Sequence, residues 1–210
     1  MMRRTAVVVS LIVAAACSSS GSPKSSLAPG AVNRPKPGVY VYTLTSTKGP
    51  ALPAGLERIE TLSVSGNRYT SVISDNKNSN RVTYTRGWSS SGETLVAADV
   101  STPTGSIQCA YHPPPRVLPL PLKIEKLPRQ TYTAPNLSCA GSKDIDVVDK
   151  ETVKDGKGHR WSTYRIDETT IESSTSTTQI HWFSPELGAD IRSESVSKSL
   201  TTLSVLIDHP

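Results

Sequence analysis

At residues 39–45 the chain reads Val39-Tyr-Val-Tyr-Thr-Leu-Thr45, and every residue of this run except Leu44 is β-branched or aromatic. Such residues fit the pleated, half-buried surface of a strand. Similar short runs recur along the chain between polar turns, and Thr, Ser and Val stand where a helix would favour Ala, Leu and Glu. The sequence therefore predicts a strand here and an all-β fold around it.

The predicted strands follow one another at nearly regular spacing. Gly66-Asn67 lies between two of them and is typical of a two-residue hairpin turn. No segment shows convincing helical periodicity, so we expect about eleven strands and little or no helix apart from the signal peptide. The expected strands are 39–45, 57–65, 69–74, 81–86, 93–101, 106–111, 144–153, 159–167, 169–183, 189–197 and 198–208. Strands without intervening helices predict an antiparallel sheet.

A proline-rich segment at 112–128 interrupts this spacing. It begins His112-Pro-Pro-Pro-Arg-Val-Leu-Pro-Leu-Pro-Leu-Lys-Ile124, and proline lacks the donor that a central strand needs. We expect an extended, polyproline-like loop over the surface of the domain. A docking motif for a proline-recognising groove is the lesser alternative.

The N-terminus predicts export. Arg3 and Arg4 precede an apolar run, and Ala14-Ala-Ala16 leads into Cys17. This order is typical of a secretory signal, and it is shorter than the roughly 20 apolar residues of a membrane-spanning helix. A cysteine directly after small residues resembles the lipobox of bacterial lipoproteins, which implies a diacylglyceryl anchor on Cys17. Ala14 stands where that family usually has leucine, and a plain secreted protein beginning at Cys17 is the alternative.

These features divide the chain into three parts. Residues 1–16 are the expected lipoprotein signal peptide, and 17–37 are an expected disordered tether rich in Ser and Pro. Residues 38–210 form the expected β domain. The formal net charge of +5 includes Arg3 and Arg4, which leave with the signal. No Lys/Arg cluster longer than two residues follows the signal, so nucleic acid is not an expected partner.

The chain has three cysteines, Cys17, Cys109 and Cys139. If Cys17 is acylated, an even pair remains in an oxidising compartment, and a disulfide between Cys109 and Cys139 is the natural outcome. Without acylation one thiol is left over. Two cysteines without a nearby histidine do not predict a zinc site.

Catalytic motifs are missing from the sequence, which has no Gly-x-Ser-x-Gly, His-Glu-x-x-His, Cys-x-x-Cys or phosphate-binding glycine loop. His181, between Ile180 and Trp182, is expected to be a half-buried structural histidine. Asp144, Asp146 and Asp149 could suggest calcium, but Asp144 and Asp146 are expected on a solvated strand face from which Asp149 alternates away. We expect no enzyme, no cofactor and no metal.

The three tryptophans, Trp88, Trp161 and Trp182, could line a ligand-binding surface. Because the chain has few aromatic residues, we expect them to anchor the core instead.

Two passages resemble uncharacterised Gram-positive lipoproteins. One runs from Ile107-Gln-Cys-Ala-Tyr-His-Pro-Pro-Pro through Pro119-Leu-Pro-Leu-Lys to Cys139, and the other is Ile180-His-Trp-Phe-Ser-Pro-Glu-Leu-Gly-Ala-Asp-Ile-Arg192. Related proteins look like the half-barrel of the LolA-like superfamily of lipoprotein carriers, in which an eleven-stranded antiparallel sheet curls around an apolar cavity. The resemblance implies a single curved sheet. Those carriers close the cavity with helices, and none is predicted here.

Together these expectations describe a monomeric lipoprotein held on the outer face of the bacterial cell membrane by Cys17. Its curved sheet would bind an apolar ligand such as a lipid or an acylated molecule. The alternative is a structural or interaction module of the cell envelope without a small-molecule ligand, which the polar run Ser173-Ser-Thr-Ser-Thr-Thr178 favours.

Overall fold

The computed structural model describes residues 27–77, 80–173 and 175–210. These residues form a 14-stranded antiparallel sheet and one short 3-10 helix, Leu137–Cys139, so the all-β prediction is confirmed. The strands are β1 (Gly38–Lys48), β2 (Glu57–Ser65), β3 (Arg68–Asp75), β4 (Arg81–Ser89), β5 (Gly92–Thr102), β6 (Gly105–Ala110), β7 (Arg116–Pro119), β8 (Glu125–Lys126), β9 (Gln130–Tyr132), β10 (Gly141–Lys154), β11 (Arg160–Glu172), β12 (Thr175–Ser184), β13 (Ala189–Val196) and β14 (Thr201–Asp208). No helix in these ranges is long and apolar enough to cross a membrane.

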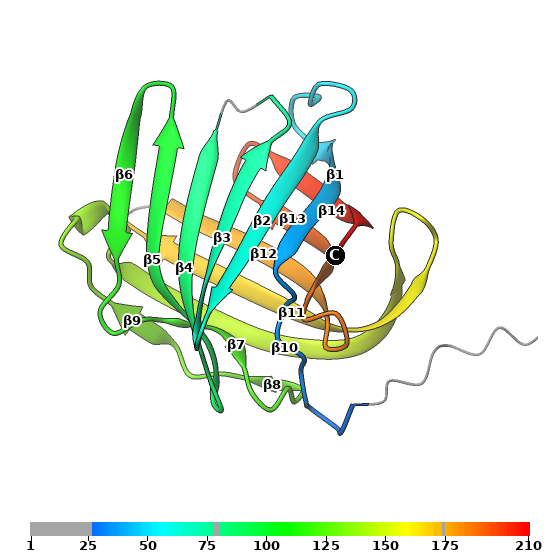
Figure 1. Cartoon of the computed structure of the whole chain (residues 1–210). Helices are drawn as coiled ribbons and strands as arrows, with labels where there is room; N and C mark the ends of the chain where they lie inside the picture. Colours follow the sequence, from blue (N-terminus) through cyan, green and yellow to red (C-terminus); the bar gives the residue numbers. More distant parts are fainter. Residues whose placement is uncertain (1–26, 78–79, 174) are drawn as a thin grey trace, which may run out of the picture.

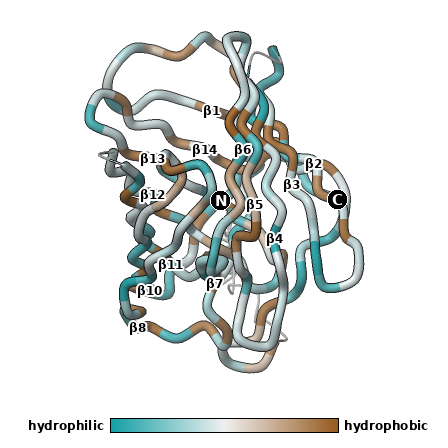
Figure 2. Tube along the Cα trace, turned by 90° about the vertical axis from the view of Figure 1, so that its left-hand side faces the viewer, coloured by the Kyte–Doolittle hydropathy of each residue, from teal (hydrophilic) through white to brown (hydrophobic). Residues whose placement is uncertain are grey.

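The sheet has the order β6-β5-β4-β3-β2-β1-β14-β13-β12-β11-β10-β8, with β7 beside β5 and β9 beside β10. The pairing of β1 with β14 joins an N-terminal half to a C-terminal half. In Figure 1 the strands of the first half cross in front of those of the second, so the sheet curls back on itself. Figure 2 shows the two halves from the side, with hydrophilic positions interspersed among the hydrophobic ones. The predicted curved half-barrel is confirmed.

All eleven predicted strands are present, and the structure adds three short ones, β7, β8 and β9. One boundary was wrong. Residues 169–183 are not one strand, because Thr169–Glu172 belongs to β11 and β12 begins at Thr175. The chain turns near Ser173, whose φ of 53° is a left-handed conformation that a run of Ser and Thr does not announce.

The sequence predicted that the proline-rich segment lies over the surface, but part of it is buried against the sheet. Its strand β7 pairs with β5, and Leu118 and Leu122 are only 4% and 2% exposed. The Leu120 N–H donates to the Ser91 carbonyl at 3.1 Å. Prolines tolerate this position because β7 is short and pairs with the sheet on one side, so few ladder donors are required. The leucines between the prolines are therefore free to enter the core.

The predicted tether also differs from the structure where the structure describes it, from Leu27 to Pro37. Gly30 and Pro35 are buried. The Leu122 N–H donates to the Gly30 carbonyl, and the Asn33 N–H donates to the Pro185 carbonyl, both at 2.9 Å. These residues pack along the domain. The predicted signal peptide and Cys17 lie outside the described residues.

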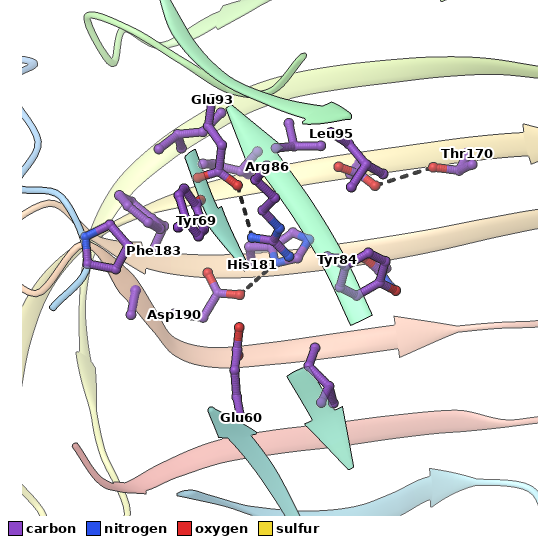
Figure 3. Close-up of a pocket in the computed structure, with 18 of the residues that line it drawn as sticks. Glu60, Tyr69, Tyr84, Arg86, Glu93, Leu95, Thr170, His181, Phe183 and Asp190 are labelled. Atoms are coloured by element: carbon purple, nitrogen blue, oxygen red, sulfur yellow. Dashed lines mark hydrogen bonds and ion pairs between the residues drawn. The ribbon is translucent and has the colours of Figure 1, made fainter. Parts of the chain in front are cut away.

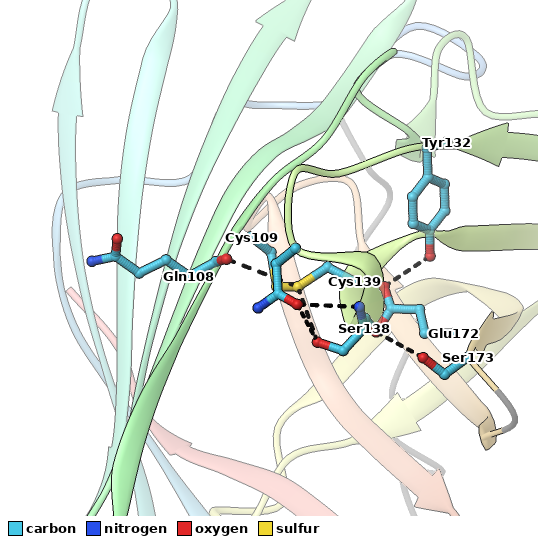
Figure 4. Close-up of a disulfide and its surroundings, with 8 residues drawn as sticks. Gln108, Cys109, Tyr132, Ser138, Cys139, Glu172 and Ser173 are labelled. Carbon is cyan, nitrogen blue, oxygen red and sulfur yellow. Dashed lines mark hydrogen bonds between the residues drawn. A yellow bond between two sulfur atoms is a disulfide. The ribbon is translucent and has the colours of Figure 1, made fainter.

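The predicted disulfide between Cys109 and Cys139 is present, with a Cα–Cα distance of 5.7 Å. Cys109 lies on β6, at one edge of the sheet, and Cys139 directly precedes β10, near the other edge (Figure 4). Two backbone hydrogen bonds of 2.8 Å between His112 and Thr133 tie the same two regions. The two edges of the half-barrel are thus held together at this end.

Candidate functional site: a cavity lined by tyrosines and ion pairs

A cavity of about 410 Å³ lies between the two halves of the sheet. Its lining comes from both halves, from β7 and from the N-terminal segment that contains Pro35. The side chains that face it alternate along their strands, as the period of two in a β-strand requires. The cavity therefore exists because the sheet curls, and its chemistry is set by the inward-facing residues (Figure 3).

Tyrosines form much of the cavity wall. Six of the 7 tyrosines in the chain line it, whereas none of the three tryptophans does. Those six are Tyr40, Tyr42, Tyr69, Tyr84, Tyr111 and Tyr132. The tryptophans were expected in the core. Trp88 and Trp161 pack at the edges of core clusters, and Trp182 is 8% exposed with Arg192 stacked 4.5 Å from its ring centroid.

Two partly buried ion pairs line the N-terminal half. Arg58 Nη2 donates to Glu60 Oε2 at 2.7 Å, and Arg86 Nη1 donates to Glu93 Oε1 at 2.9 Å. The Ser71 hydroxyl donates a further, short hydrogen bond to Glu60. In the sequence, Arg58 and Glu60 share a strand face with Leu62, so the period of two could have placed them inside.

Two more pairs line the C-terminal half. Lys143 Nζ donates to Glu168 Oε1 at 2.5 Å, and His181 Nδ1 lies 2.8 Å from Asp190 Oδ2. Thr170 donates a weaker hydrogen bond of 3.3 Å to the same Glu168 oxygen. His181 is thus inside the cavity and paired, in line with the expected partly buried histidine.

A β-bulge explains how Asp190 reaches His181. The register between β12 and β13 shifts at Trp182/Phe183, so that Asp190 lies opposite Phe183 while Arg192 lies opposite Trp182. A bulge adds one residue to a strand and changes which side chains share a face. Asp190 therefore lines the cavity although Arg192 does not. Counting alternate residues in the sequence cannot detect this shift.

The ion pairs set the charge state of the cavity wall. Burial opposes the charged forms of Glu60, Glu168 and Asp190, but neighbouring cations outweigh it, and each carboxyl pKa lies below its ordinary value. Burial likewise lowers the pKa of His181, but Asp190 and Glu168 overcome it, and the net result is a raised pKa. These three carboxyls and His181 consequently favour their charged forms.

The cavity wall combines apolar and polar side chains. Ile166, Phe183 and Leu118 are buried and belong to one hydrophobic cluster with Ile145 and Val147. The half-buried side chains that line the cavity include the apolar Ile73 and Val117 and the polar Thr170, Glu172 and Gln179. Such a cavity suits a ligand that has both apolar and polar parts.

The aspartates that the sequence placed on a solvated face are separate from the cavity. Asp144 forms a 2.5 Å ion pair with Arg129, and neither Asp144 nor Asp146 lines the cavity. Within the described part of the chain, no group of three or more His, Cys, Asp and Glu side chains is placed to hold a metal ion.

Comparison with protein-family models and with curated proteins gave no match. Among solved structures, the chain is similar to the hypothetical lipoprotein YmcC from Escherichia coli K12, with a TM-score of 0.37 and 9% sequence identity. The alignment covers 85% of this chain and 90% of that chain. A likeness of this degree does not establish a shared family or function.

Proposed function

We propose that this protein is a lipid-anchored, extracytoplasmic binding protein whose half-barrel holds a small amphipathic ligand. The observation that carries the proposal is the cavity between the two halves of the sheet. Its volume of about 410 Å³ falls in the usual range for ligand sites of roughly 300–1,000 Å³. The proposed anchor is a diacylglyceryl group on Cys17, supported by the signal-like N-terminus.

The lining favours a ligand different from the apolar one expected from the sequence. A wholly apolar molecule would displace water from around Arg58, Glu60, Lys143 and Glu168 without replacing its hydrogen bonds. Leaving buried polar groups without partners is costly. A ligand with an apolar part for Phe183 and its neighbours, and a polar part for the charged walls, avoids that cost.

Ligand binding is tested by mass spectrometry of solvent extracts from the exported protein and by calorimetry with the recovered compound. Gln179→Trp should fill part of the cavity and abolish the bound compound, because Gln179 lines it. Ser176→Trp is the matched control, since Ser176 is exposed on the same strand and does not line the cavity. A bare protein mass in the wild type, with no binding to any extracted lipid fraction, would support the interaction-module alternative.

The anchor is tested separately with Cys17→Ser in a bacterial host. The wild-type protein should partition into the detergent phase, and the variant should partition into the aqueous phase or keep its signal. Wild-type protein that enters the aqueous phase with an unmodified Cys17 would show a secreted, non-lipidated form.

A further inference from the structure

Glu172 differs from the other carboxylates of the cavity. Glu60, Glu93, Glu168 and Asp190 each form an ion pair with a cavity-lining cation. Glu172 lines the same cavity and forms no ion pair among the described residues. Its hydrogen-bond donor is the Tyr132 hydroxyl, 3.0 Å from Glu172 Oε1 (Figure 4). Within the described ranges, one half-buried carboxylate therefore faces the cavity without an ion-pair partner.

The whole lining shows the same imbalance. Its carboxylates are Glu60, Glu93, Glu168, Glu172 and Asp190, and its cationic residues are Arg58, Arg86, Lys143 and His181. Even with His181 protonated, the carboxylates exceed the cations. Inside a low-dielectric cavity an uncompensated negative charge attracts a cation strongly.

Aromatic rings surround this carboxylate. Tyr111 and Tyr132 pack edge to face, with ring centroids 5.3 Å apart, and both line the cavity. The Tyr132 hydroxyl donates to Glu172. Burial raises the pKa of both phenols, and the negative charge of Glu172 adds to that effect. A carboxylate beside tyrosine rings is a combination that recognises ammonium groups.

The position of Glu172 fits a ligand that spans the cavity. Glu172 and Ile166 lie on the same strand, six residues apart, which corresponds to about 20 Å. Ile166 is buried in the apolar cluster, whereas Glu172 is half-buried. An ammonium group at Glu172 would leave an attached apolar chain pointing toward Ile166 and Phe183.

We propose that the cavity selects an amphipathic cation, an ammonium group carried on an apolar chain, with Glu172 as its counter-ion and Tyr111 and Tyr132 as the aromatic wall. This inference deepens the proposed function, because it rests on the cavity being a binding site and specifies the chemical class of the ligand. It involves recognition only, with no covalent step.

Binding of three probes of equal chain length, decylammonium, decanol and decanoate, tests this by calorimetry below their micelle-forming concentrations. We expect decylammonium to bind the full exported protein most tightly and decanoate most weakly. Glu172→Gln keeps an acceptor for the Tyr132 hydroxyl and should lower decylammonium affinity about ten- to a hundredfold. Decanol affinity should change by less than about twofold, because decanol carries no charge to pair with Glu172.

Two controls separate the cavity from surface binding. Glu125→Gln removes an exposed carboxylate on β8 and should leave decylammonium affinity unchanged. Gln179→Trp should weaken all three probes. Equal affinity for the three probes, or an unaffected Glu172→Gln, overturns the cation inference while the binding function stands. If none of the three probes binds and Gln179→Trp does not change the compound extracted from the exported protein, both the cation inference and the proposed binding function are overturned.

Discussion

Ion pairs inside and outside the half-barrel lie in opposite environments. On the inner face, Lys143 and Glu168 have side chains only 6% and 11% exposed, whereas Lys157, in the turn between β10 and β11, and Asp208, at the end of β14, are 56% and 66% exposed. A buried charge loses its water and depends on its partner, while an exposed one exchanges its partner for water at little cost. An ion pair therefore contributes differently to stability when it is buried and when it is exposed.

The inner face also departs from the usual pattern of an antiparallel sheet, in which the covered face is apolar. Here hydrophobic clusters fill part of the interior, and paired charges and tyrosines surround the cavity between them. Retaining charges in the interior is difficult to explain by stability alone, since well-packed apolar residues often serve as well. The difference supports the proposed binding of a ligand that carries polar groups.

The largest loss of stability is expected for Lys143→Met, on the inner face. Glu168 would be left buried with only Thr170 as a donor, and the free energy of unfolding should fall by about 3–5 kcal/mol in urea denaturation at neutral pH. The double variant Lys143→Met/Glu168→Leu should recover most of this loss, because no unpaired charge remains. A single variant as stable as the wild type would show that water already reaches Glu168.

Removing the disulfide should make the inner ion pair more like an exposed one. Cys109→Ser/Cys139→Ser opens a loop with a sequence separation of 30 residues and should cost about 3–4 kcal/mol in the chain-entropy view. Because this bond holds the edges of the half-barrel together, its loss should also admit water to the inner face. The cost of Lys143→Met should then be smaller in the disulfide-free protein than in the wild type, which a double-mutant cycle measures. Strict additivity of the two losses would contradict this coupling.

The inner face should also impose a pH dependence. The raised pKa of His181 means that its contribution to stability is complete below its unfolded value of about 6.5 and is lost as the pH rises through the folded-state pKa. The lowered pKa values of Glu60, Glu168 and Asp190 give contributions that are complete above about pH 4.3 and are lost on further acidification.

Glu172 changes stability with pH in the direction opposite to that of these three carboxyls. Burial raises its pKa, so its contribution favours the folded state at low pH and is lost as the pH rises through that pKa. Because one carboxyl opposes three, we expect maximal stability between about pH 4.3 and 6.5.

His181→Asn tests the alkaline side of this profile. It keeps a donor for Asp190 but removes the charge, and should cost about 1.5–3 kcal/mol at pH 5.5. The cost should shrink toward pH 8.5 in urea denaturation. A cost that is equal at both pH values would show that His181 does not titrate in the folded protein.

The smallest effect is expected at the exposed ion pair. Lys157→Met removes the partner of Asp208, and both side chains are mostly exposed. We expect no measurable change in the urea midpoint at physiological ionic strength, where salt screens such pairs. A loss of stability comparable to that of Lys143→Met would contradict the expectation that the exposed pair contributes less than the buried one.

Local patterns accounted for the strands. The β-branched run at 39–45 became β1, the Gly66-Asn67 turn joined β2 to β3, and Ile145 and Val147 alternated into the core. The short strands of the proline-rich segment were missed because pairing with a distant strand, not local preference, holds them in place. The packed segment from Leu27 to Pro37 was missed for the same reason, since its partners Leu122 and Pro185 are remote in sequence.

The sequence by itself determined the all-β class, the antiparallel order of the main strands and the pair of cysteines available for a disulfide, because strand preference, hairpin turns and cysteine number are local or compositional properties. Only the tertiary structure decided that Glu168, His181 and Asp190 share a cavity with the tyrosines. Their meeting depends on the curl of the sheet and on the bulge in register beside Asp190, and both arise from contacts between strands that are far apart in the chain.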